Sequence, residues 1–130
     1  MSHSTFRKAL IAVAAATLTT GAALAHHSFA SEYDRDQPFR IEGAVNEVIW
    51  TNPHGWLHVD VEEDGKTVTY ELELASPSTL MRQGWRRNDL MPGDKIVVTG
   101  FRARNRFHVG RAAGISREDG EAIYGFGIDD

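Results

Sequence analysis

The sequence predicts a small, mainly β protein with five strands around one core and one short helix between the third and fourth strands. Apolar residues recur at every second position in short runs, which is the spacing of half-buried strands. Turn-forming pairs such as Asp64-Gly65 and Pro92-Gly93 separate these runs. At 130 residues with 42% hydrophobic content, the chain has room for one core and no second domain.

Residues 1–25 predict a cleaved secretory signal peptide. Arg7 and Lys8 form a basic start, residues 9–18 are apolar, and Ala23-Leu24-Ala25 has the small-x-small pattern of a cleavage site. The apolar run is too short to span a bilayer. We therefore expect an exported chain that begins at His26, with no membrane span after cleavage.

The charge argues against a nucleic-acid partner. Cleavage after Ala25 removes two basic residues and no acidic one, which lowers the net charge from −4 by two, to −6. Such a surface repels phosphate backbones. The local arginine clusters are interpreted as solvated edges; they are Arg82, Arg86 and Arg87, and Arg102, Arg104 and Arg106. The absence of cysteine excludes disulfides and thiolate ligands.

The first half of the mature chain predicts an arm and three strands. Residues 26–38 are a polar arm, extended or partly helical, and residues 39–50 form a long strand whose alternation breaks near Glu47, as at a bulge. The second strand places Leu57, Val59 and Val61 on one face and Trp56, His58 and Asp60 on the other. The third, after the Asp64-Gly65 turn, places Tyr70 and Leu72 inside and Glu71 and Glu73 outside.

The second half predicts the helix and the last strands. Ser76 caps a short helix that begins at Pro77 and ends at Gly84, with Leu80 and Met81 buried. Strands are expected from Lys95 to Phe101 and from about Phe107 to Ser116, and Asp119-Gly120 predicts a small terminal hairpin. This order is typical of the oligonucleotide/oligosaccharide-binding (OB) barrel over residues 39–118, with 119–130 as a hairpin and tail; a small sandwich is the alternative.

A series of motifs resembles one family. The motifs are Ala25-His26-His27-Ser28-Phe29, Trp50-Thr51-Asn52-Pro53-His54 with Trp56, Ser76-Pro77, Gly84-Trp85 and Leu90-Met91-Pro92-Gly93-Asp94. The chain resembles the exported bacterial proteins of domain of unknown function 6152 over nearly the whole mature sequence. The resemblance implies a Gram-negative, periplasmic setting and carries no activity, cofactor or catalytic residue.

The histidines suggest a metal site. Cleavage before His26 would leave an α-amine and an imidazole on one residue, and a third nitrogen from His54, or else His58, would complete a nitrogen-only site that favours copper(II). A competing chelate uses His27. A zinc site of His54, His58 and Glu71 or Glu73 is a further alternative, and a carboxylate is expected beside any ligating histidine. Each histidine also has a plain structural interpretation, as a turn cap or an exposed strand residue.

No phosphate loop, nucleophile elbow or His-Glu-x-x-His motif occurs, so an enzyme is not expected. Two functions remain. The first is a periplasmic binding or accessory module that holds a small ligand or a periplasmic protein with the Trp56/His58/Glu71/Glu73 face and the Asn52-Pro53-His54 turn. The second is a copper-binding protein anchored by His26.

Overall fold

The computed structural model describes residues 29–125. The chain divides into two compact units, Met1–Ser31 and Glu32–Asp130. In the first unit, residues 29–31 are described, and they are helical. The predicted signal peptide, His26 and His27 lie outside the described residues. No helix among the described residues is long and apolar enough to cross a membrane.

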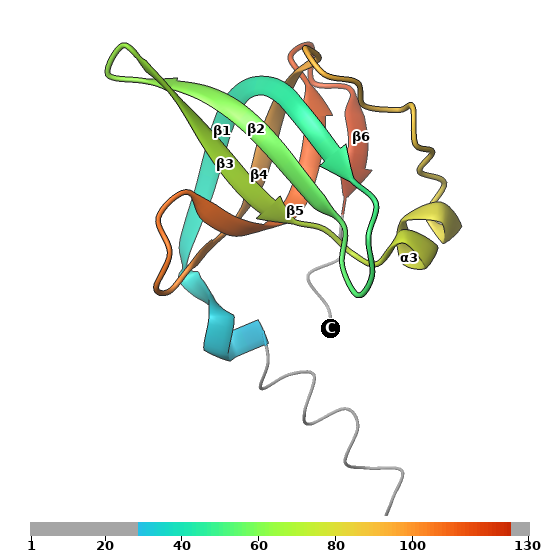
Figure 1. Ribbon diagram of the computed structural model, residues 1–130, viewed down its shortest axis with the longest axis horizontal. Coiled ribbons are helices and arrows are strands. Elements are labelled where there is room, and N and C mark those ends of the chain that lie inside the picture. Colours follow the sequence, from blue (N-terminus) through green and yellow to red (C-terminus); the bar gives the residue numbers. More distant parts are fainter. Residues whose placement is uncertain (1–28, 126–130) are drawn as a thin grey trace, which may run out of the picture. The chain divides into compact units, whose positions relative to one another are not determined.

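The second unit is mainly β, as predicted (Figure 1). Its described part holds one six-stranded sheet in the order β3-β2-β1-β4-β5-β6. The strands are β1 (Tyr33–Ile49), β2 (Trp56–Glu63), β3 (Lys66–Glu73), β4 (Lys95–Ala103), β5 (Val109–Arg117) and β6 (Ala122–Gly125), and the helix α3 (Pro77–Arg82) lies between β3 and β4. The terminal hairpin predicted at Asp119-Gly120 is confirmed, because β6 pairs antiparallel with β5.

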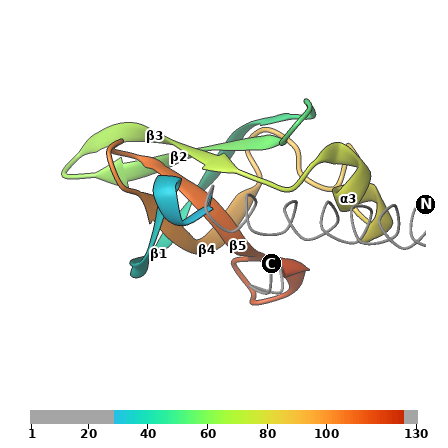
Figure 2. The ribbon, with the colours of Figure 1, turned by 90° about the horizontal axis from the view of Figure 1, so that it is seen from below.

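A sixth pairing joins the first five strands into a ring. β3 and β5 run parallel to each other, with Glu71 opposite Val109, Leu72 opposite Gly110 and Glu73 opposite Arg111. Seen from below, the β2–β3 hairpin lies on one side, β1, β4 and β5 lie on the other, and α3 stands at one end (Figure 2). This parallel contact brings residues together that no hairpin connects.

The long first strand departs from the prediction at its start. β1 begins at Tyr33 rather than Phe39, so part of the predicted arm belongs to the sheet, and its register against β4 shifts between Asp34 and Pro38. The predicted irregularity near Glu47 is confirmed, because the register between β1 and β2 shifts between Val45 and Glu47. Bulges of this kind bend a strand, which lets β1 pair with both β2 and β4.

The core fills the interior of the ring. Leu57, Val59, Leu72, Ile96 and Val98 are fully buried, as the alternation predicts. Trp85, which follows α3 in the chain, is 3% exposed, and its ring contacts those of Trp50 and Tyr124. In α3, Leu80 is buried but Met81 is 52% exposed, so the predicted burial of Met81 is wrong. A helix as short as α3 buries only one face, and Leu80 is the residue on that face.

One glycine shows how closely neighbouring strands approach. A Cβ added at Gly100 would lie 2.1 Å from the backbone oxygen of Arg111 and 2.8 Å from the Phe39 ring. Glycine removes this clash, and the register between β4 and β5 shifts at this point. Beyond the shift, Gly110 and Arg111 of β5 pair with β4 on one side and with β3 on the other.

Candidate functional site

The turn between β1 and β2 is fixed to the end of β3. The backbone N–H of Gly55 donates to Ala75 O at 3.0 Å, and that of Leu74 donates to Gly55 O at 2.8 Å. A Cβ at Gly55 would lie 3.3 Å from Ile49 O and 3.4 Å from Ala75 O, so a larger residue would loosen this contact. The two hydrogen bonds continue the β2–β3 ladder into the turn and place His54 above Glu73.

Glu73 lies at the centre of a buried polar cluster. Its side chain is 7% exposed. Its Oε1 accepts a hydrogen bond of 2.6 Å from an Nη of Arg111 and lies 2.9 Å from His54 Nδ1, and its Oε2 accepts a hydrogen bond from the Tyr33 hydroxyl. The alternation of β3 points Glu73 away from the core, but the turn, Tyr33 and Arg111 cover it. The predicted exposure of Glu73 is therefore wrong.

The donors around Glu73 come from separate parts of the chain. Tyr33 begins β1, Arg111 lies on β5 and His54 belongs to the turn. Arg111 also donates to Leu74 O at 3.2 Å. A buried carboxylate is stable only when it is paired and hydrogen-bonded, and these donors meet that requirement. We define Tyr33, His54, Glu73 and Arg111 as the Glu73 cluster.

The Tyr33 hydroxyl stays protonated in this cluster. Burial raises the pKa of Tyr33 far above its ordinary value, and the hydrogen bond to Glu73 and the negative charge of that carboxylate raise it further. Arg111 opposes the shift. The phenol is therefore a permanent donor to Glu73 throughout the physiological pH range.

His54 has the geometry of an oriented imidazole. An ionised carboxylate only accepts hydrogen bonds, so the His54 Nδ1 beside Glu73 carries the proton. In the neutral ring, Nε2 then holds the lone pair, and the side chain is 47% exposed. A carboxylate on one ring nitrogen is the arrangement that orients a histidine for ligation through the other.

A second polar row crosses the outer face of the sheet next to the cluster. His58 on β2 lies opposite Glu47 on β1 and Glu71 on β3 in the strand register. The Nδ1 of His58 is 3.1 Å from Glu47 Oε1, and Arg106 donates to Glu71 at 3.2 Å. On the same face Asp60 accepts hydrogen bonds from Asn46 and Thr69, which lower the pKa of its carboxyl.

The predicted site residues fall into separate groups. Asn52 is exposed in the turn and Trp56 is half-buried beside it, while Glu71 is partly exposed on β3. His54 and His58 pair with different carboxylates, and residues 29–125 contain no group of three or more histidine or acidic side chains placed to hold a metal ion. These residues thus do not form the zinc site considered from the sequence.

Sequence reasoning missed Tyr33 and Arg111. Tyr33 was assigned to the arm, and Arg111 lies in a strand of small residues, between Gly110 and Ala112. A charged side chain flanked by such residues is a weak signal of a close approach. Nothing in the local pattern connects it to Glu73, because the link is the parallel contact between β3 and β5.

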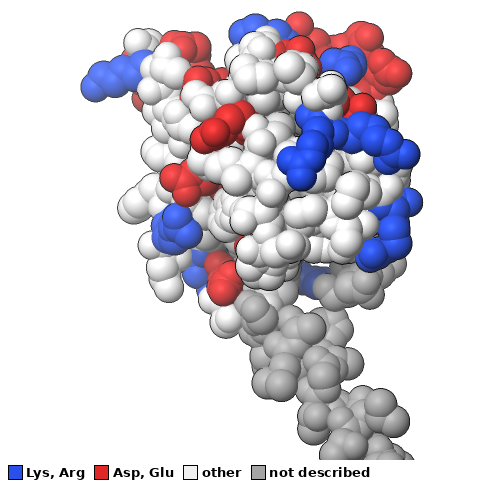
Figure 3. All heavy atoms as spheres, turned by 45° about the vertical axis from the view of Figure 1, so that its right-hand side comes forward, with Lys and Arg blue, Asp and Glu red and all other residues white. Residues whose placement is uncertain are grey.

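The arginines predicted as solvated edges are exposed, as expected. On the side of the molecule where α3 lies, basic side chains gather along one margin beside a broad uncharged area (Figure 3). Arg87 lies over the Trp50 ring at 5.3 Å. This contact is a cation–π interaction between one surface arginine and a partly buried ring.

A family model described as "Family of unknown function (DUF6152)" matches residues 13–115. Comparison with curated proteins and with solved structures finds no match.

Proposed function

The chain belongs to the family of unknown function DUF6152, and we propose that it is a non-enzymatic, periplasmic binding or accessory module built on an OB-like barrel. The ring of five strands, its parallel β3–β5 contact and the helix between β3 and β4 support the OB-like assignment. The fold by itself assigns no ligand, so the proposal depends on the surface.

The binding face is the outer side of the β2–β3 hairpin with the turn beside it. Asn52, Trp56, His58 and Glu71 contribute the exposed and half-buried side chains. The observation that carries the proposal is the Glu73 cluster, which joins the turn, β1, β3 and β5 beside Trp56, the register partner of Glu73. A face held in one geometry before a ligand arrives loses less entropy on binding.

The chemistry of this face favours a ligand with a positive charge beside a flat apolar group. Glu47, Asp60 and Glu71 supply carboxylates, and the Trp56 ring offers a stacking surface. Both a small ligand and a segment of a periplasmic protein can present these groups.

Phenethylamine, which carries an ammonium beside a ring, is a suitable probe, with phenylacetate as its anionic counterpart. In an NMR titration, we expect the backbone signals of the turn and of residues 56, 58 and 71 to move with phenethylamine. Trp56→Ala and Glu71→Gln should each weaken binding roughly fivefold. Glu42→Gln, which removes an exposed carboxylate from β1, is the matched control.

Stronger binding of phenylacetate, or shifts that Trp56→Ala leaves unchanged, would contradict the proposed face. Thermal unfolding of each variant identifies any loss that comes from unfolding rather than from the site.

One observation favours a second function, copper binding. His54 has the carboxylate on Nδ1 that a ligating histidine needs, and Nε2 is the nitrogen that it would offer. In this alternative His26 supplies its amine and its imidazole, with His27 as the competing ligand. A nitrogen-only set of this kind prefers copper(II) among the divalent first-row metals.

Copper(II) titration followed by electron paramagnetic resonance tests this alternative. We expect His54→Ala to change the spectrum and weaken binding, and binding to weaken as pH falls through the histidine range. His108→Ala is the control, because no ligand role is assigned to it. Adding one residue before His26 should abolish tight binding. Equal spectra for all of these proteins would contradict the copper alternative, and the binding module would be the one remaining proposal.

A further inference from the structure

A pocket lies between the end of β4 and the loop that follows it. Its volume is about 390 Å³, and its lining residues are Gln37, Arg102, Ala103, Arg104, Asn105, Arg106 and Phe107. This volume falls within the range of small-ligand sites, about 300–1,000 Å³. Phe107 is 94% exposed, which is the largest exposure among the large apolar side chains of the described residues.

The loop is held at both ends, so the exposure of Phe107 is built into the fold. At its start, the Arg104 N–H donates to Glu32 O at 2.9 Å. At its end, the Glu71 N–H donates to His108 O at 2.8 Å, and the His108 ring contacts the Tyr70 ring edge-on with centroids 4.9 Å apart. His108 turns toward β3 with a φ of 56°, and Phe107 before it projects outward.

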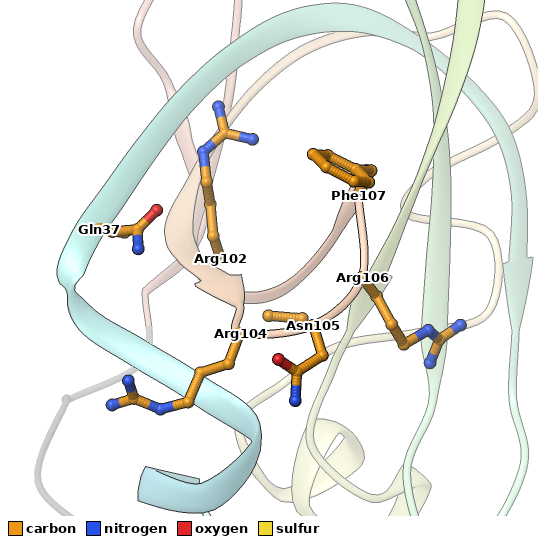
Figure 4. A pocket seen from close by; sticks show the side chains of 7 residues that line it. Gln37, Arg102, Arg104, Asn105, Arg106 and Phe107 are labelled. Atoms are coloured by element: carbon orange, nitrogen blue, oxygen red, sulfur yellow. The ribbon is translucent and has the colours of Figure 1, made fainter.

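The three arginines of the pocket differ in their partners. Arg104 pairs with Asp34 and Arg106 with Glu71, each at 3.2 Å, and their side chains diverge to opposite sides (Figure 4). Arg102 lies near the Tyr70 hydroxyl, and this hydroxyl donates a hydrogen bond of 2.5 Å to Glu63. Among residues 29–125, no carboxylate forms an ion pair with Arg102.

Arg102, Gln37 and Phe107 surround the same opening, and the amide of Gln37 points toward Arg102 (Figure 4). A guanidinium with spare donors and an adjacent amide together bind an oxyanion well. An aromatic ring exposed beside them offers a stacking surface to a flat group attached to that anion. The pocket can therefore recognise both an anionic group and a flat apolar group.

We propose that the pocket formed by Gln37, Arg102 and Phe107 binds an anionic ligand, a carboxylate or phosphate attached to a flat apolar group. Arg102 and Gln37 hold the anion, and the Phe107 ring stacks on the flat group. Arg104 and Arg106 line the rim and are each paired with an acid, so Arg102 is the cation of the pocket that is left for the ligand.

This site is independent of the face proposed above for the β2–β3 hairpin. The two sites prefer ligands of opposite charge, and neither Arg102 nor Phe107 belongs to that face. Arg106 is the residue nearest to both, through Glu71, and is therefore left unchanged in the test.

Phenyl phosphate is the probe, compared with inorganic phosphate and benzyl alcohol in NMR titrations of the protein. We expect phenyl phosphate to move the signals of Gln37 and residues 102–107 and to bind more tightly than either part alone. Arg102→Gln and Phe107→Ala should each weaken binding roughly tenfold. Arg40→Gln and Met91→Ala are the matched controls, since both are exposed residues outside the pocket.

Three results would overturn the proposal: shifts confined to other regions, equal affinity for inorganic phosphate and phenyl phosphate, or full binding by both variants with unchanged thermal unfolding. Sedimentation with phosphatidylglycerol vesicles separates a lipid source of the anion from a free one. If the protein binds the vesicles but not phenyl phosphate, and Phe107→Ala abolishes the vesicle binding, the proposal of a small ligand is wrong. The pocket would then bind a membrane surface.

Discussion

The guanidinium of Arg111 donates a hydrogen bond of 2.6 Å to the carboxylate of Glu73, and the two residues are register partners on the parallel strands β5 and β3. This contact lies where the ring of five strands is joined. Charge pairing and strand pairing therefore depend on each other at this point, and the β1–β2 turn depends on both through His54.

Replacing Arg111 by methionine should leave the Glu73 carboxylate buried without its cation. We expect the free energy of unfolding, measured in urea, to fall by about 3 kcal/mol. Arg106→Met is the control, because its pair with Glu71 is largely exposed and should contribute less than about 1 kcal/mol. Adding Glu73→Gln to Arg111→Met should restore part of the loss; a further loss would contradict the account of the unpaired charge.

Tyr33→Phe should destabilise the protein by about 1–3 kcal/mol at neutral pH, because Glu73 loses a donor in a buried site. The effect should depend on pH. The pKa of Tyr33 is raised in the folded protein, so its contribution is complete below the ordinary tyrosine pKa near 10 and is lost as pH rises above that value. Urea unfolding at pH 8 and pH 11 measures this, and the difference between wild type and variant should shrink at pH 11.

Asp60 should make the free energy of unfolding depend on pH in the acid range. Hydrogen bonds from Asn46 and Thr69 lower the pKa of Asp60 in the folded protein, so its contribution is present above the ordinary aspartate pKa near 4 and is lost as pH falls below it. Between pH 5 and pH 3, Asp60→Asn should therefore lose less stability than the wild type. Asp36→Asn is a suitable comparison, and an equal loss in wild type and Asp60→Asn would contradict the assignment.

Gly100→Ala should disturb the sheet at the register shift between β4 and β5. The added Cβ would meet the backbone oxygen of Arg111, which cannot rotate away, and we expect a loss of about 3 kcal/mol in urea unfolding. Gly114→Ala is the comparison, because its Cβ would lie 3.0 Å from the Thr99 hydroxyl, which can rotate. A small effect at both positions would show that β4 and β5 are less closely packed than described.

Much of the sheet was predictable from local pattern. The alternation of apolar and polar residues predicted β2 and β3, and the Asp64-Gly65 pair predicted the hairpin between them. The break in alternation near Glu47 predicted the irregularity of β1. The start of β1 was not predictable, because residues 34–37 are polar and give no alternation, and the pairing with β4 is interrupted by a register shift between Asp34 and Pro38. The prediction that Met81 is buried was wrong because a helix as short as α3 buries only one stripe of side chains.

The candidate site was partly predictable. His54, His58, Trp56 and Glu71 stand out in the sequence as residues that can bind, and a carboxylate lies beside each of the two histidines. Whether either histidine binds a metal stays a prediction. Glu73 was assigned to the exposed face because alternation reports only which side of a strand a residue takes. It cannot report that a turn and another strand cover that side.

The sequence alone determined the mainly β class, the helix between the third and fourth strands and the residue types available for binding, because these depend on spacing between neighbours in the chain. Only the tertiary structure decided that Glu73 is buried, that Arg111 and Tyr33 bind it, and that Phe107 stands exposed beside Arg102. The reason is the contact between β3 and β5, which joins segments that no short turn connects. Hydrogen bonding in such a contact is set by the closure of the whole ring, and no local pattern encodes it.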